Sequence, residues 1–236
     1  MHSAPTRRAG LTAPPPLENG DHLTAKEFPR RYDAMPEVKK AELINGIVYM
    51  GSPVRITHHG EPENLIQTWL GTYQAGTPGT CAAANTTVRF GPRNVPQPDA
   101  LLMIRREHGG NAKIGRDGPV HGAPDFVVEV AGSSASIDLH AKLEAYRSAG
   151  VREYLVWCAP EKSLKWFSLE DGAFHELSAG PDGVISSKIM PGLVLDTTAL
   201  LNLDSASLLR RLSRSLNKGA HKLFVRQLVE ARPHGK

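Results

Sequence analysis

At 236 residues, the chain is long enough for one substantial domain with extensions. Apolar residues make up 40% of it and charged residues 22%, an ordinary composition for a globular protein. No apolar run approaches the roughly 18 residues that span a bilayer, and the N-terminus lacks the apolar core of a signal peptide. Cys81 and Cys158 show no metal or redox spacing, so we expect reduced core thiols in a cytoplasmic protein.

The net charge of +4 hides an asymmetry along the chain. Residues 205–236 hold eight Lys and Arg residues and one acid, a net charge of +7, whereas the preceding 204 residues hold 20 basic and 23 acidic residues, a net charge of −3. Two interpretations stay open for this basic tail. It either binds a polyanion or forms the solvated face of a helix.

The sequence of the N-terminal half predicts two helices, one before and one after a β-hairpin. Residues 1–21 are rich in Pro, Gly and Ala and are expected to be disordered. In residues 21–32, Thr24 as N-cap and Glu27 three residues later predict a short helix. Asn45-Gly46, between apolar residues, predicts a two-residue hairpin turn. Residues 59–75 then predict a helix whose apolar face consists of Leu65, Ile66, Trp69 and Leu70.

The rest of the chain alternates strands and helices. Strands are predicted at residues 81–90, after Pro96 and Pro98 up to residue 104, and at residues 126–130 and 152–158, with two or three more between 164 and 189. Residues 107–123 are Gly-rich and basic and predict a mobile loop. Helices are predicted from about Ile137 to Ser148, with Ser136 as the best cap candidate, and in the tail from Ser205. This order predicts an α/β fold, a sandwich around one mixed sheet.

Three acids lie within or at the start of apolar segments that are predicted to be strands. Glu129 lies within FVVEV, Glu42 begins the hairpin, and Asp99 precedes ALLMI. A buried lone carboxylate is costly unless it is protonated, paired or bound to a cation. Each acid taken alone is best explained by a nearby Lys or Arg or by a solvent-facing strand end. Three acids converging at one sheet edge instead suit Mg²⁺, which prefers oxygen ligands, and we favour that interpretation.

The helix after FVVEV adds a lysine to this set. Asp138, Lys142 and Tyr146 are spaced by four residues and share one helix face. One interpretation is a surface ion pair between Asp138 and Lys142, worth a few tenths of a kcal/mol, with Tyr146 packing. The other is that Lys142 points at the carboxylates, where it orients a nucleophilic water and stabilises negative charge. Spacing alone does not choose between them.

The quoted motifs resemble a known family. AELINGIVYMGSP, HHG, VPQPDALLMI and PDFVVEVAGSSASIDLHAKLEAYRSAGVREYLVW, in this order over about residues 23–200, resemble the Uma-two family of endonucleases. That family belongs to the PD-(D/E)XK, restriction-endonuclease-like superfamily. The resemblance implies a mixed β-sheet flanked by helices, with a divalent-metal nuclease site at one sheet edge.

The resemblance also implies roles for individual residues. Asp99, in the Pro-Asp element, and Glu129 become metal ligands, and Glu42 binds the metal directly or through water. Ala131 stands where the superfamily pattern has its lysine, and Lys142 fits the displaced position on the following helix. His59, Asp138 and Tyr146 are candidates for substrate contact or support. The family more often has a proline after the Glu-Val pair, whereas this chain has AGSSAS.

The sequence thus predicts a cytoplasmic, Mg²⁺- or Mn²⁺-dependent endonuclease that acts on DNA. We expect a nuclease-like domain at residues 22–203 and a basic helical extension at residues 204–236. Nucleases of this kind often pair subunits, which makes a homodimer an open expectation. Two alternatives remain: a catalytically silent nucleic-acid-binding module on the same fold, and a hydrolase of another kind.

Overall fold

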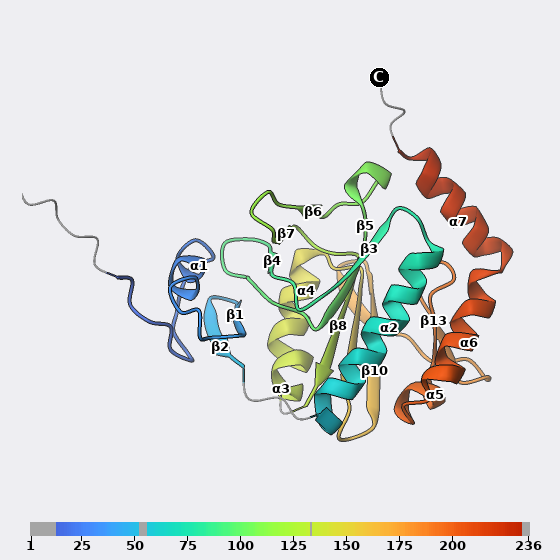
Figure 1. Cartoon of the computed structure of the whole chain (residues 1–236), viewed down its shortest axis with the longest axis horizontal. Coiled ribbons are helices and arrows are strands. Elements are labelled where there is room, and N and C mark those ends of the chain that lie inside the picture. The colour runs from blue at the N-terminus through green and yellow to red at the C-terminus, as the bar shows by residue number, and fades with distance from the viewer. Residues whose placement is uncertain (1–12, 52–55, 133, 233–236) are drawn as a thin grey trace, which may run out of the picture.

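The computed structural model describes residues 13–51, 56–132 and 134–232 and centres on a six-stranded mixed sheet (Figure 1). In spatial order its strands are β11 (Ala173–Glu176), β10 (Ser163–Glu170), β9 (Glu153–Cys158), β8 (Phe126–Ala131), β5 (Ala100–Ile104) and β3 (Thr80–Ala84). Only β8 and β9 pair in parallel, and the other neighbouring strands are antiparallel. The predicted α/β fold with a mixed sheet is confirmed.

Helices cover both faces of this sheet, which explains why β5, β8 and β9 are buried along their whole length and mostly apolar. On one face, α2 (Glu61–Gly76) packs Trp69 against Phe126 and Trp166. On the other lies α4 (Leu143–Ala149), where Tyr146 meets Tyr154.

Strand periodicity then assigns Glu129 to one of these faces. Alternate residues of a strand point to opposite sides of its sheet. Val127 and Ala131 of β8 belong to the apolar cluster on the α4 side, so Glu129 between them points toward α4 as well. The glutamate and the helix that carries Lys142 therefore share one face of the sheet.

The predicted hairpin is confirmed as β1 (Ala41–Ile44) and β2 (Ile47–Met50). Asn45 and Gly46 at its turn have φ angles of 53° and 84°, a left-handed conformation that Asn and Gly tolerate. The short helix α1 (Glu27–Tyr32) packs beside it through Phe28. Thr24 Oγ1 accepts the Glu27 amide at 3.2 Å, but the N-cap residue is Lys26 and not Thr24 as predicted.

Part of the segment 1–21, which the sequence predicts to be disordered, is folded. Residues 1–12 lie outside the described residues. Leu17, however, is 3% exposed within the hairpin cluster, and the Gly20 amide donates to the Val48 carbonyl at 2.8 Å. Residues from about Leu17 onward therefore pack as part of the folded body.

One loop prediction and one strand prediction need correction. The segment 107–123 is not a plain loop: after a 3₁₀ turn η2 (Arg106–His108) it forms β6 (Lys113–Ile114) and β7 (Val120–His121). The predicted strand 81–90 is split into β3 and β4 (Val88–Arg89), because Asn85 between them takes a left-handed φ of 48°. β4 pairs with β7 and completes a small three-stranded sheet.

The C-terminal segments pack against the main sheet. They comprise β12 (Val184–Ser186), β13 (Val194–Asp196), α5 (Thr197–Leu201), α6 (Ser205–Leu216) and α7 (Gly219–Glu230). The side-chain carboxylates of Asp196 and Asp204 cap α5 and α6. Leu208 and Leu212 are fully buried in the core beside α2. The tail leucines therefore dock on the body.

Within the described residues, no helix combines the length and apolar composition needed to cross a membrane. Cys158 is buried and Cys81 half-buried, both as free thiols.

Candidate active site

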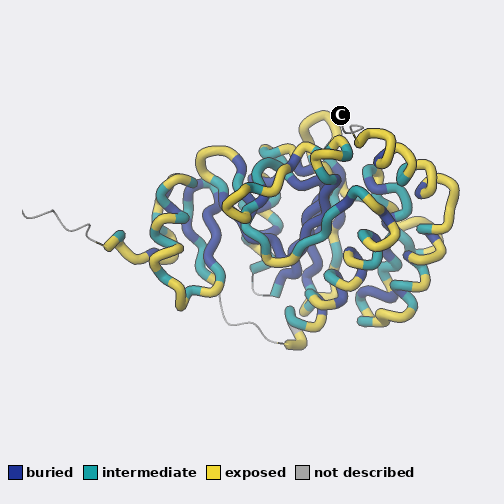
Figure 2. Tube along the Cα trace, turned by 45° about the horizontal axis from the view of Figure 1, so that its top comes forward, coloured by how far each residue is buried: buried dark blue, intermediate teal, exposed yellow. Residues whose placement is uncertain are grey.

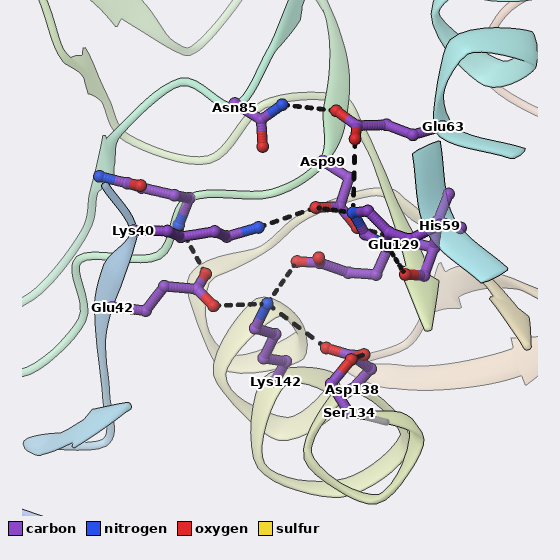
Figure 3. Close-up of polar contacts among 12 residues, drawn as sticks. Lys40, Glu42, His59, Glu63, Asn85, Asp99, Glu129, Ser134, Asp138 and Lys142 are labelled. Carbon is purple, nitrogen blue, oxygen red and sulfur yellow. Dashed lines mark hydrogen bonds and ion pairs between the residues drawn. The ribbon is translucent and has the colours of Figure 1, made fainter. Parts of the chain in front are cut away.

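The four side chains that the sequence singled out converge from four separate segments (Figure 3). Glu42 lies in β1, Asp99 directly precedes β5, Glu129 lies in β8, and Lys142 ends the π-helical turn η3 (Asp138–Lys142). Lys142 Nζ lies 2.9 Å from Glu42 Oε2 and 3.0 Å from Glu129 Oε1. All four side chains are buried.

Lys142 occupies the centre of the carboxyl cluster. Its third neighbour is Asp138, with 3.3 Å between Lys142 Nζ and Asp138 Oδ1. Lys142 is 4% exposed and Asp138 1%, so the surface ion pair that the spacing allowed is excluded. Asp138 Oδ1 has no hydrogen bond to any described residue, whereas Asp138 Oδ2 accepts the Ser134 hydroxyl at 2.6 Å.

The helix that carries Lys142 is irregular, contrary to the prediction of one regular helix over 137–148. It runs as α3 (Ala135–Ile137), then η3, then α4. Ser134, not Ser136, stands at its N-cap. A π turn interrupts the regular helical hydrogen-bond ladder and is common at functional sites. Two side chains donate to carbonyls of this turn: Tyr154 to Asp138 at 2.9 Å and Asn45 to Ala141 at 3.4 Å.

Fixed donors anchor the three acids. The backbone amide of Gln97 donates to Glu42 Oε1 at 2.7 Å, and that of Val130 donates to Asp99 Oδ2 at 2.8 Å. The Tyr146 hydroxyl donates to Glu129 Oε1 at 2.8 Å. Tyr146 is thus fully buried and supports the cluster through its hydroxyl, beyond the packing that the helical spacing indicated.

Burial and neighbouring charges perturb the protonation of the cluster. Burial raises the pKa of Glu129 well above its ordinary value; Lys142 opposes this, and the carboxylates of Asp99, Asp138 and Glu42 add to it. Burial also raises the pKa of Asp138, against the attraction of Lys142. For Asp99 burial acts in the same direction, but Lys40, Lys142 and His59 outweigh it and lower the pKa.

Lys142 stays charged in this environment. Burial lowers the pKa of its ammonium, but the attraction of Glu129, Glu42, Asp138 and Asp99 is larger in sum and raises it well above the ordinary value. The carboxyl groups around the ammonium therefore favour its protonated form.

A second lysine was missed by sequence reasoning. Lys40 Nζ lies 2.8 Å from Asp99 Oδ1, and its side chain is 30% exposed, so it stands at the mouth of the cluster. The signal was present in the sequence, because residues two apart in an extended segment share a face. Lys40 lies two residues before Glu42 and points into the same site (Figure 3).

His59 and Glu63 form the remaining wall. His59 Nδ1 lies 2.7 Å from the Val130 carbonyl oxygen, which can only accept, so Nδ1 carries a proton. His59 Nε2 faces Glu63 at 3.4 Å and Asp99 at 3.6 Å. The hydrogen bond to Glu63, together with both carboxylates, raises the pKa of His59 against its burial. Glu63 was not among the predicted site residues, although it lies one helical turn after His59.

The donor set matches the chemistry of a divalent cation. Glu42, Asp99, Glu129 and Asp138 supply four carboxyls against the ammonium groups of Lys40 and Lys142, a net charge of −2 when all are ionised. Oxygen donors with this excess charge suit Mg²⁺ or Mn²⁺. In the described ranges, no three acids or histidines are arranged as ligands of one ion. Lys142 Nζ bridges Glu42, Glu129 and Asp138, and Lys40 Nζ contacts Asp99.

The mixed sheet and the acids gathered around a helix-borne lysine define a chain of the restriction-endonuclease-like class of nuclease folds. Comparison with known proteins supports this class. The model of the Uma2 family, described as "Putative restriction endonuclease", matches residues 25–198. That is well over half of the chain, and the chain belongs to the Uma2 family.

The fold also has a relative among solved structures. It is similar to the crystal structure of a "putative nuclease belonging to DUF820" from Anabaena variabilis, with a TM-score of 0.54 and 13% sequence identity. The match covers 69% of this chain and 90% of that chain. No curated protein matches the chain significantly. At this identity the structural likeness concerns the fold alone.

Proposed function

We propose that this chain is a divalent-metal-dependent endonuclease that hydrolyses phosphodiester bonds in DNA. The observation that carries the proposal is the meeting of Glu42, Asp99, Glu129 and Lys142, with Lys142 Nζ within 3.0 Å of two of the acids. These residues come from distant parts of the chain. Burying them together is costly for stability and is typical of functional sites.

Asp99 and Glu129 would hold the cation, with Glu42 in support. When bound, a divalent cation polarises the scissile phosphate and lowers the pKa of a water molecule. The Val130 amide and the Tyr146 hydroxyl fix the two main ligands, as supporting contacts usually do around metal ligands.

The two lysines have different tasks in this proposal. Lys142 is enclosed by carboxyls and keeps its proton, so it acts by stabilising developing negative charge and orienting the attacking water. Lys40 is held only by Asp99 among the described acids and reaches the mouth of the site. It can leave Asp99 when the cation enters and then contact a phosphate of the substrate.

One observation favours a catalytically silent nucleic-acid-binding module as the second candidate. The lysines already stand between the carboxylates, so the cluster is partly neutralised without an added cation. Calorimetric titration with Mn²⁺ separates the candidates, because a silent module shows no stoichiometric binding.

Cleavage of supercoiled plasmid DNA tests the proposal. The purified protein is incubated with plasmid and Mg²⁺ or Mn²⁺, beside the Asp99→Ala variant and an EDTA control. Nicked or linear DNA produced by the parent alone, and only with metal, supports the proposal. Equal product from the parent and Asp99→Ala contradicts it.

We also propose that the enzyme is cytoplasmic, a compartment in which its two thiols stay reduced. Its oligomeric state is a separate question, and analytical sedimentation will show whether it forms a homodimer.

A further inference from the structure

The basic tail lies beyond the family match, which ends at residue 198. Five basic residues recur at every fourth position of the tail, two on α6, one at the N-cap of α7 and two on α7, and we call them the basic stripe. They are Arg210, Arg214, Lys218, Lys222 and Arg226. All five are exposed, and the described tail contains a single acid, Glu230.

Packing holds the stripe on the outside of the molecule. Leu208, Leu212 and Leu228 are buried against the body, so the opposite sides of both helices face outward, as the exposed outer edge of Figure 2 shows. His221 fastens α7 further: its Nε2 lies 2.9 Å from the Thr77 hydroxyl and its Nδ1 2.7 Å from the Leu216 carbonyl. The stripe is therefore a fixed surface.

Its charge is not compensated by the described part of the protein. None of the five side chains forms an ion pair with a described residue, whereas the neighbouring Arg211 pairs with Asp182 at 2.9 Å. The rest of the chain, residues 1–204, carries a net charge of −3. A polyanion is therefore repelled by the body as a whole and attracted by these two helices.

The stripe fits the backbone of a nucleic acid better than a lipid surface. On α7 alone, Lys218 at the N-cap, Lys222 and Arg226 span roughly 12 Å at helical rise, about three to four phosphates along one strand at 3.4 Å each. A helix that binds membranes needs a broad free apolar face. Here the leucines are already buried, and the exposed large apolar residues of α7 are Leu223 and Val229.

The surface is also placed to serve the candidate active site. α6 packs beside α2, and a hollow lined by Glu61 and Asn64 of α2 and by Ser205 and Leu209 lies between the two helices near their N-terminal ends. The N-terminal turn of α2 also carries Glu63, which contacts His59 in the site. The stripe thus starts on the helix adjacent to the one that forms a wall of the site.

We propose that α6 and α7 form a docking surface for the phosphate backbone of duplex DNA, separate from the candidate active site. The choice of DNA rests on the proposed function, while the polyanion chemistry rests on the stripe itself. The surface adds affinity that the negatively charged body does not supply, and it reads no base sequence.

Two triple variants of equal net charge test this surface. The stripe variant is Lys218→Gln, Lys222→Gln and Arg226→Gln. The matched control removes three exposed positive charges elsewhere, with Lys26→Gln, Arg30→Gln and Lys165→Gln. Glutamine is a good helix former, and thermal unfolding by circular dichroism checks that both variants remain folded.

Binding of a fluorescent 30-base-pair duplex is measured by anisotropy in EDTA over a range of salt concentrations. Neutralising three phosphate contacts makes the slope of log K against log salt shallower by up to about 2.7. We therefore expect the slope of the stripe variant to be shallower by about 2 to 2.7 and that of the control to be almost unchanged. Equal slopes in the two variants overturn the proposal. So does a stripe variant that keeps DNA binding but loses binding to phosphatidylserine vesicles.

The absence of metal keeps this test independent of cleavage. If the plasmid assay shows no cleavage but the stripe variant loses its salt slope, the docking surface stands and the nuclease proposal fails. If cleavage depends on Asp99 and the slopes are equal, the nuclease proposal stands and the docking surface fails.

Discussion

Replacing Lys142 by methionine tests the physical core of the site. Methionine keeps much of the length and apolar volume of the lysine stem and removes the charge, so packing changes little. Three carboxyls within 2.9, 3.0 and 3.3 Å of the ammonium lose their common partner in a buried environment. Breaking a buried ion pair by removing one partner costs roughly 3–5 kcal/mol, which for a chain of this size corresponds to a fall in Tm of about 6–20 °C.

The penalty of Lys142→Met must depend on pH. Without the ammonium, the buried carboxyls bind protons more tightly in the folded than in the unfolded protein. A raised folded pKa adds stability that is complete below the unfolded value and is lost as pH rises. The loss of stability is therefore largest near pH 8 and shrinks toward about pH 5.

Urea unfolding of the metal-free parent and variant at both pH values measures this penalty. Lys165→Met, at an exposed position, is the control and should change stability by no more than about 0.5 kcal/mol. A Lys142→Met penalty below about 1 kcal/mol near pH 8, or one that is equal at both pH values, contradicts this role of the ammonium.

Three further outcomes are expected. Burial raises the pKa of Glu129 in the folded protein above its ordinary value of 4.5. The stabilisation that comes from protonating Glu129 is therefore complete below pH 4.5 and is lost as pH rises through the raised pKa. Glu129→Gln therefore reduces the fall in Tm from about pH 5 to 8 in EDTA, and a fall as large as the parent's contradicts the assignment. Lys40→Gln removes the ammonium that occupies Asp99, so Mn²⁺ should bind a few-fold to about tenfold more tightly by calorimetry. The exposed Lys39→Gln should leave the affinity unchanged, and unaltered or weaker binding by Lys40→Gln counts against exchange at Asp99. Tyr146→Phe loses the hydrogen bond to a buried carboxyl and should cost roughly 1–3 kcal/mol in urea unfolding; a variant as stable as the parent shows that the bond is absent.

The sequence predicts the sheet, and it indicates candidate site residues, because these signals are local or strongly constrained. Asn45-Gly46 between apolar residues predicts a hairpin turn, and a run such as FVVEV predicts a strand buried on both faces. A charged residue in such a strand requires compensation, so the position of Glu129 in the sequence is enough to predict a partner or a bound cation.

The missed features depend on contacts between distant residues. In the sequence, nothing distinguishes Glu63 from other acids in the first turn of a helix. Its partner Asn85, which donates to it at 2.5 Å, lies 22 positions away. The π turn at Lys142 has no sequence signature of its own; Asn45, 96 residues before Ala141, donates to it. β7, which pairs locally with β6, also pairs with β4, whose residues lie about 30 positions earlier in the chain. Local secondary-structure propensity does not predict such long-range contacts.

Anomalous diffraction from a crystal soaked in Mn²⁺ tests most directly whether this cluster is a metal-dependent nuclease site. We predict an anomalous peak in contact with the carboxylates of Asp99 and Glu129, with Lys40 displaced from Asp99 and Lys142 still beside Glu42. A cluster that keeps Lys40 on Asp99 and shows no peak at saturating Mn²⁺ contradicts a metal-dependent site.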